Sequence, residues 1–356
     1  ALAALLGEAA PGTSPVEIAI LKATDVISAW AKTAGRDVPV YVTDQKKKLD
    51  DVKDFQNLGD ELRKQSGDHA AVAKGFAIQI RKTRAVQQAQ DATVESPIIP
   101  DGKARAYILD SIRHPAEVEL LRHIYQDAFV LIGVVCEETT RLNRVTEKYA
   151  DAGRANALAF MKRDAKALEK YGQRVSDAFH LADFFVDNTA DRHKADGTPN
   201  ADWDVSEKLS RLVKILRHSE IVRPELNETA MAHAHSAGMR SACLSRQVGA
   251  ALTDRSGNVL STGCNEVPRA GGGVYGDAFD ADHAEDHRCA YRKVKGHDLP
   301  FCSNTLVQNE IIKELIDDIG TLKPVTDDDR QALAQLFRTG RIGSLIEFSR
   351  AVHAEM

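Results

Sequence analysis

Two residues near the carboxyl end, His353 and Glu355, have the types and the spacing of a metal-dependent hydrolytic site. A neutral imidazole can bind Zn²⁺, and the ion lowers the pKa of a bound water so that a nucleophile forms at neutral pH. A carboxylate two residues further on can accept the proton of that water and pass it to the substrate. We therefore interpret His353 as a zinc ligand and Glu355 as the catalytic acid and base. The alternative for His353 is a histidine on a helix surface.

A second His-x-Glu element, His283–Glu285, shows that the motif alone is weak evidence. Its His283, together with His287, Cys289 and Cys302, could hold a structural zinc. A catalytic site there is disfavoured, because no second cysteine lies beside Cys302. We favour a loop that covers a substrate, in which Arg288 and Arg292 face phosphates.

The segment before this loop predicts a helix followed by a β-hairpin. The helix covers Glu225–Cys243, and two strands, Gln247–Thr253 and Val259–Gly263, flank a turn in which Gly257 takes a positive φ. Cys264 and Asn265 come directly after the second strand. Cys264 is interpreted as a pocket residue or a small buried cysteine, and Asn265 as a substrate contact or a turn residue.

Several short pieces, in order along the chain, resemble the deoxycytidylate deaminase family. In this half of the sequence they are Arg246–Ala250, Ser261–Asn265, Pro268, Leu345–Arg350 and Val352–Glu355. The first half is similar to the P-loop kinase-like domain of the two-domain anti-phage deoxycytidine nucleotide deaminases. Its matching pieces are Phe55–Gly59, Arg63, Tyr107–Pro115, Gly172–Gln173 and Ala182–Asn188.

This resemblance implies zinc-dependent hydrolytic deamination of dCTP or dCMP, which would deplete deoxycytidine nucleotides during infection. It implies that Asn265 contacts the deoxyribose of the nucleotide. We expect Arg246, Cys264, Arg288 and Arg292 to be substrate-binding residues as well. The resemblance also implies homo-oligomers and, in some members, a regulatory RNA. The family's Pro-Cys-x-x-Cys ligands and its phosphate-binding loop do not occur in this sequence, so we expect the sequence to be a piece of a longer chain. Cys264 stands where many relatives carry an aromatic residue.

The first half predicts a doubly wound α/β sheet, because short apolar strands alternate with helices. Strands are expected at Arg105–Asp110, Phe129–Val135 and Ala182–Asn188, and helices at Val16–Thr33 and Asp54–Gln90 with a break near Gly67. Arg113 and His114 follow a strand directly, where such sheets place ligand contacts, and we assign them a nucleotide role. A proline-started helix is the alternative.

We expect two domains joined by a polar linker. Residues 1–190 form the P-loop kinase-like α/β domain, 191–204 the linker, and 205–356 the cytidine-deaminase-like α/β/α domain. A second hypothesis is a nucleoside or nucleotide kinase whose second domain senses nucleotides, although no Walker lysine motif is present. A polynucleotide-editing deaminase is disfavoured, because aromatic residues make up 6% of the chain.

Composition excludes several broad classes of protein. The 356 residues are 43% hydrophobic and 28% charged, which is typical of a globular protein and not of a disordered one. The net charge of -5 indicates no general affinity for polyanions. Five scattered cysteines indicate a reducing compartment, and we expect a cytoplasmic protein. No apolar run reaches the length of a membrane span.

Overall fold

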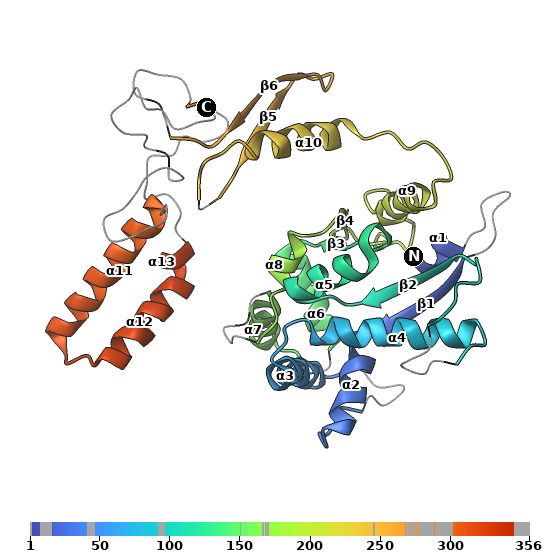
Figure 1. Ribbon diagram of the computed structural model, residues 1–356, viewed down its shortest axis with the longest axis horizontal. Helices are drawn as coiled ribbons and strands as arrows, with labels where there is room; N and C mark the ends of the chain where they lie inside the picture. The colour runs from blue at the N-terminus through green and yellow to red at the C-terminus, as the bar shows by residue number, and fades with distance from the viewer. Residues whose placement is uncertain are drawn as a thin grey trace. The chain divides into compact units, whose positions relative to one another are not determined.

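The structure is a computed structural model that divides into two compact units, Ala1–Val222 and Arg223–Met356. It describes residues 2–7, 16–40, 47–91, 97–149, 151–165, 167, 171–244, 246–267, 269, 275–276, 288 and 302–344. Figure 1 shows the helices and strands of both units.

The first unit contains two pairs of parallel strands with helical connections. β1 (Glu17–Lys22) pairs with β2 (Arg105–Asp110), and β3 (Ile132–Val135) pairs with β4 (Phe184–Asp187). Parallel pairing requires a long crossover, which the helices between the two strands of each pair supply. The prediction of a mixed α/β fold is confirmed. Among the described residues, however, these strands form two two-stranded sheets and not one continuous doubly wound sheet.

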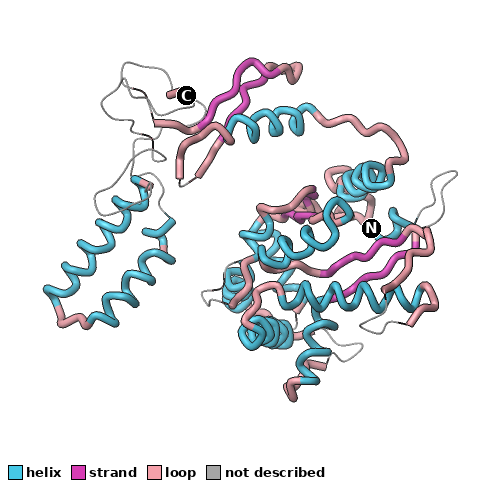
Figure 2. Tube along the Cα trace, in the orientation of Figure 1, coloured by secondary structure: helices cyan, strands magenta, loops and turns pink. Residues whose placement is uncertain are grey.

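The helices of the first unit account for most of its described residues (Figure 2). They are α1 (Leu2–Gly7), α2 (Ala23–Thr33), α3 (Leu49–Ser66), α4 (Ala71–Gln87), α5 (Pro115–Tyr125), the 3₁₀ turn η1 (Gln126–Ala128), α6 (Glu138–Lys148), α7 (Arg154–Ala165), α8 (Val175–Phe179) and α9 (Val205–Arg217).

The helix expected over Val16–Thr33 is wrong in its first third. Residues Glu17–Lys22 are β1, in register with β2 from Glu17 opposite Arg105 to Lys22 opposite Asp110. β-branched residues favour an extended chain, and the ladder with a distant strand overrides the helical pattern. The break expected near Gly67 is confirmed, since this residue ends α3 with a φ of 64°.

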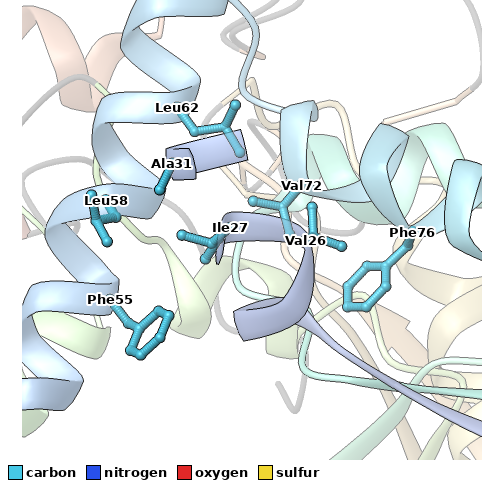
Figure 3. Packing of buried hydrophobic residues seen from close by; sticks show 8 residues of the cluster. All are labelled: Val26, Ile27, Ala31, Phe55, Leu58, Leu62, Val72 and Phe76. Atoms are coloured by element: carbon cyan, nitrogen blue, oxygen red, sulfur yellow. The ribbon is translucent and has the colours of Figure 1, made fainter. Parts of the chain in front are cut away.

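The main core of the first unit lies between α2, α3 and α4 (Figure 3). Its buried side chains are Val26, Ile27, Ala31, Phe55, Leu58, Leu62, Val72 and Phe76. Burial of each large apolar side chain contributes roughly 1.5–3 kcal/mol of stability. This packing fixes α3 beside the ends of β1 and β2, where the first candidate site lies.

The segment expected as a linker is part of the first unit. The Trp203 indole donates to the side-chain oxygen of Asn188 at 3.0 Å, and α9 packs through Val205 and Leu209 on Val186 of β4. The contacts therefore divide the chain after Val222, later than the expected boundary at 191–204.

The second unit contains α10 (Leu226–Gly238), the antiparallel strands β5 (Gly249–Thr253) and β6 (Val259–Cys264), and the helices α11 (Ser303–Leu322), α12 (Asp327–Thr339) and α13 (Arg341–Ser344). The predicted hairpin is confirmed, and Gly257 in its turn has a φ of 83°. α10 lies against the hairpin, where Gly238 and Gly249 allow the two backbones to approach closely (Figure 1). None of the described helices is long and apolar enough to cross a lipid bilayer.

Candidate functional sites

A pocket of about 320 Å³ opens at the carboxyl ends of β1 and β2 in the first unit. Lys22 and Asp110, the last residues of these two strands, line it together with residues of α2 and α3. In parallel sheets this edge is where ligands bind, because loops and helix starts converge there. The volume falls in the range of small-molecule sites.

A buried ion network lies along one wall of the pocket. The Arg63 guanidinium donates to Glu117 Oε1 at 2.8 Å and to Asp60 Oδ1 at 3.2 Å. The Arg63 side chain is 3% exposed and that of Glu117 is 1% exposed. Because charges this deeply buried are stable only when paired, the network fixes α3 against α5.

A second group of polar side chains joins α3 to the segment around α7. The Gln56 amide nitrogen donates to Asp164 Oδ1 at 3.1 Å and to Gln173 Oε1 at 3.3 Å. Arg113, which lines the pocket, donates to the same two oxygens, so four side chains hold one another in place. Gln56 also lines the pocket, and its own Oε1 is buried without a hydrogen-bond partner.

His114 caps α5 and stacks on other rings. Its Nδ1 accepts from the backbone N–H of Ala116 at 3.1 Å, so the proline-started helix expected as the alternative is present. Its ring stacks on His69 with centroids 4.7 Å apart, and His69 stacks on Tyr171 at 4.9 Å. Burial, with the nearby His69 and Arg63, lowers the pKa of His114 to about 4, so the ring is neutral at pH 7.

The hairpin of the second unit ends in a hydrogen-bonded junction built around Asn265. Its side-chain nitrogen donates to the carbonyl of Arg246 at 2.8 Å, and its Oδ1 accepts from the N–H of Val248 at 2.8 Å. Its backbone N–H continues the ladder to the carbonyl of Val248 at 3.0 Å. The Ser241 hydroxyl donates to the Asn265 carbonyl at 2.6 Å, which ties the end of β6 to the residues after α10.

Three of the residues expected to bind the nucleotide thus lie together at the open end of the hairpin: Arg246, Cys264 and Asn265. Cys264 is half-buried, and burial together with Glu266 raises the pKa of its thiol, which is therefore protonated at neutral pH. A protonated thiol fits the expected role of a small pocket residue and not that of a nucleophile.

Arg288 is held by neighbouring aromatic and backbone groups. Its guanidinium lies 4.7 Å from the ring centroid of Tyr275 and donates to the carbonyl of Gly276 at 2.5 Å. Arg288 is 3% exposed. Its expected contact with phosphate stays a prediction.

The residues expected to carry the chemistry lie outside the described part of the chain. These are His353 and Glu355. Arg292 and the segment His283–Glu285 also lie outside it. Within the described ranges, no group of three or more His, Cys, Asp or Glu side chains could hold a metal ion. The zinc site is therefore a prediction from the sequence motif.

The sequence predicted Arg113 as a site residue, but it did not predict the side chains that surround it. Gln56, Arg63 and Gln173 occur in the pieces that carry the resemblance, yet nothing marked them as site residues. One local signal was present, since Asp60 and Arg63 are one turn apart on α3 and form an ion pair. Asp164 and Gln173 are more than 100 residues from Gln56, and no local pattern links them.

Comparison with known proteins gives no assignment, because no family model and no curated protein matches this chain.

Proposed function

We propose that this protein hydrolytically deaminates a deoxycytidine nucleotide, dCTP or dCMP, with release of ammonia. The proposal rests on the ordered sequence pieces that end in His353 and Glu355, and on one arrangement in the structure. That arrangement is the junction after β6, where the side chain of Asn265 is fixed by the backbone of Arg246 and of Val248.

The junction leaves Asn265 able to contact a sugar. A primary amide nitrogen carries two hydrogens, and the carbonyl of Arg246 takes one of them. The second can donate to a hydroxyl of the nucleotide. Because both amide atoms are already held by backbone groups, this donor is oriented before substrate binds, which lowers the ordering cost of binding.

Proton transfer would be the task of Glu355. Zinc, which His353 would help to hold, supplies a water of lowered pKa at neutral pH. The Glu355 carboxylate would take a proton from that water and deliver it to the ring nitrogen and then to the departing amine. Regulation by RNA and assembly into homo-oligomers are further predictions of the resemblance, and a cytoplasmic location is the prediction from the scattered cysteines.

The experiment is to incubate the full-length protein with dCTP, dCMP and CMP and to measure ammonia and the uracil product. Glu355→Ala should abolish turnover. Glu285→Ala, which alters the other His-x-Glu element, is the matched control and should retain it. Normal turnover in Glu355→Ala, or loss only in Glu285→Ala, would show that the catalytic assignment is wrong.

A further inference from the structure

A second and larger cavity of the first unit lies between its two pairs of strands. Its volume is about 1530 Å³, which is above the range of about 300–1,000 Å³ for small-molecule sites. The whole of β2, Arg105–Asp110, lines it, and so does Phe129–Ile132, which leads into β3. Because neighbouring residues of a strand point to opposite faces, a cavity that touches all of them runs along the edge of the strand. The cavity is therefore a slot between the edges of β2 and β3.

Both edges of the slot present backbone groups that can pair with a further strand. Among the described residues, β2 pairs only with β1 and β3 only with β4. A strand in a parallel ladder points alternate N–H groups to its two sides. The alternation is set by the bond from the Glu17 N–H to the Ala104 carbonyl at 3.0 Å, and by the bond from the Asn188 N–H to the Val135 carbonyl at 2.8 Å. The N–H groups turned toward the slot are those of Arg105, Tyr107, Leu109, Ile132 and Val134.

Helices cover the β1–β2 pair on two opposite faces. Ile18 of β1 faces α1, where a Cβ at Gly7 would lie 3.5 Å from its Cδ1. Leu21, on the other face of the same strand, packs against the core of α2, α3 and α4. α1 thus lies on one face of this pair, and α2–α4 lie on the other.

The β3–β4 pair has the same two faces. Val186 of β4 is buried with Leu209 of α9, and Leu5 of α1 packs against them. The next side chain back along the strand, Phe185, points to the other face and meets Phe179 of α8, with ring centroids 5.1 Å apart. α1 therefore covers the same side of both pairs of strands.

The face on which α1 lies determines where the strand before it must be. Connections between parallel strands are almost always right-handed. The connection from β1 to β2 passes through α2–α4 on one face. A connection that enters β1 through α1, on the other face, is right-handed only if it comes from the β2 side of β1. The open position on that side is the slot between β2 and β3.

Apolar side chains beside the slot are exposed, although helices lie on both faces of the strands. Ile20 of β1 and Val134 of β3 both line the slot, and they are 56% and 57% exposed. Parallel sheets between two layers of helices are ordinarily buried on both faces. A strand in the slot would cover these side chains.

From this geometry we propose that the slot holds a β-strand formed by the residues directly before α1 in the full-length chain. This strand would pair with β2 along one edge and with β3 along the other, so that the two pairs become one continuous parallel sheet. Leu2 and Leu6 of α1 line the slot, so a segment that precedes α1 starts at its wall. Because helices cover both faces, we expect the strand to be apolar on both of its faces. The proposal does not depend on the deaminase activity, whose residues lie in the other unit.

The first test is hydrogen exchange of the full-length protein, measured amide by amide. The slot-facing N–H groups of β2 should exchange as slowly as those of Ala106 and Ile108, which the register directs to β1. Fast exchange at Arg105, Tyr107 and Leu109, alternating with slow exchange at the other two residues, would overturn the proposal.

The second test identifies the occupant by photo-crosslinking from p-benzoylphenylalanine in place of Val134. Unlabelled and ¹⁵N-labelled full-length chains are unfolded, refolded together and irradiated, and the linked peptides are sequenced by mass spectrometry. The linked peptide should come from before Leu2 and carry the same label as the peptide that holds the probe. A link between differently labelled chains would assign the slot to a second copy. That result, or a link only to residues after Gly7, would overturn the proposal.

The third test is the stability of the full-length protein with Ile20→Lys. A strand in the slot would bury this charge, so the urea midpoint should fall by at least about 1 M. Ile78→Lys, on α4 and also 56% exposed, is the matched control and should shift the midpoint by less than about 0.2 M. Equal midpoints would show that Ile20 stays open to water and would refute the strand. Failure of the deaminase assay would leave all three results unchanged, so the two proposals fail separately.

Discussion

Arg63 of α3 and Glu117 of α5 form a buried ion pair, with Arg63 Nη2 2.8 Å from Glu117 Oε1. The second oxygen of Glu117 accepts from the backbone N–H of Arg113 at 2.8 Å. One carboxylate thus joins the helix that lines the pocket to the segment that leaves β2. Because this segment carries Ser111 and Arg113 into the pocket wall, the ion pair supports the shape of the site.

Glu117→Gln should destabilise the first unit by about 1.5–3 kcal/mol, because it removes one of the two carboxylates that pair with the buried guanidinium of Arg63. Urea unfolding followed by circular dichroism would measure the loss. Glu119→Gln, at an exposed position of the same helix, should change the stability by less than about 0.5 kcal/mol. Equal stability of the two variants would show that Asp60 alone compensates Arg63.

The sequence predicted those features whose causes are local. The hairpin was predicted from two short strands that flank a turn with Gly257, and the end of α3 was predicted from Gly67. Segment Glu17–Lys22 was predicted as helix because its pairing partner, β2, lies almost ninety positions later in the chain. Long-range partners decide such a segment, and a single sequence does not display them.

The candidate site of the first unit was predictable only in part, for the same reason. Arg113 was predicted as a site residue because it comes just after an expected strand of the parallel sheet, where such sheets place ligand contacts. The environment of Gln56 depends on Asp164 and Gln173, which only the folded chain brings to it. Burial of Glu117 was also invisible in the sequence, since a glutamate in the first turn of a helix is ordinarily exposed.

His114 should make stability depend on pH between about 6.5 and 4. Its pKa is lowered from 6.5 to about 4 in the folded chain, chiefly by burial, so the unfolded chain binds more protons in this range. The stability that the neutral ring contributes is complete above pH 6.5 and is lost as the pH falls toward 4. His114→Asn keeps a cap for α5 and removes this titration.

Thermal unfolding between pH 7.5 and 4.5 would measure the effect. As the pH falls, the Tm of the parent should decrease more than the Tm of His114→Asn. His123→Asn, at an exposed position on the same helix, should follow the parent at every pH. Parallel curves for the parent and for His114→Asn would contradict the assigned environment of the ring.

Gly249→Ala should loosen the contact between α10 and the hairpin. A Cβ at this position would lie 1.8 Å from the carbonyl oxygen of Ala234 and 2.3 Å from the backbone nitrogen of Gly238. Backbone atoms cannot move aside as a side-chain end can, so we expect a loss of about 3 kcal/mol. Gly276→Ala meets nothing within 4 Å and is the control. Chemical denaturation that gives similar midpoints for both variants would refute the close approach.

Asn265→Asp should break one of the two side-chain hydrogen bonds at the hairpin junction and keep the other. The carboxylate can still accept from the N–H of Val248. Its second oxygen would replace the side-chain nitrogen of Asn265, which lies 2.8 Å from the carbonyl oxygen of Arg246 in the parent. Repulsion between the two oxygens should cost about 1–3 kcal/mol and expose the Arg246 carbonyl to water.

The deaminase proposal makes the same substitution informative about function, because it removes the donor assigned to the sugar. We expect KM for the deoxycytidine nucleotide to rise at least about tenfold, while hydrogen exchange at the N–H of Val248 stays slow because Oδ1 still accepts from it. Asn227→Asp, in the exposed first turn of α10, is the control, because it also replaces an amide by a carboxylate. The helix dipole favours a negative charge at this end, so KM and the exchange at Val248 should both stay unchanged. A KM that stays at the parent value, with slow exchange at Val248, would assign Asn265 to the hairpin alone and remove it from the nucleotide site.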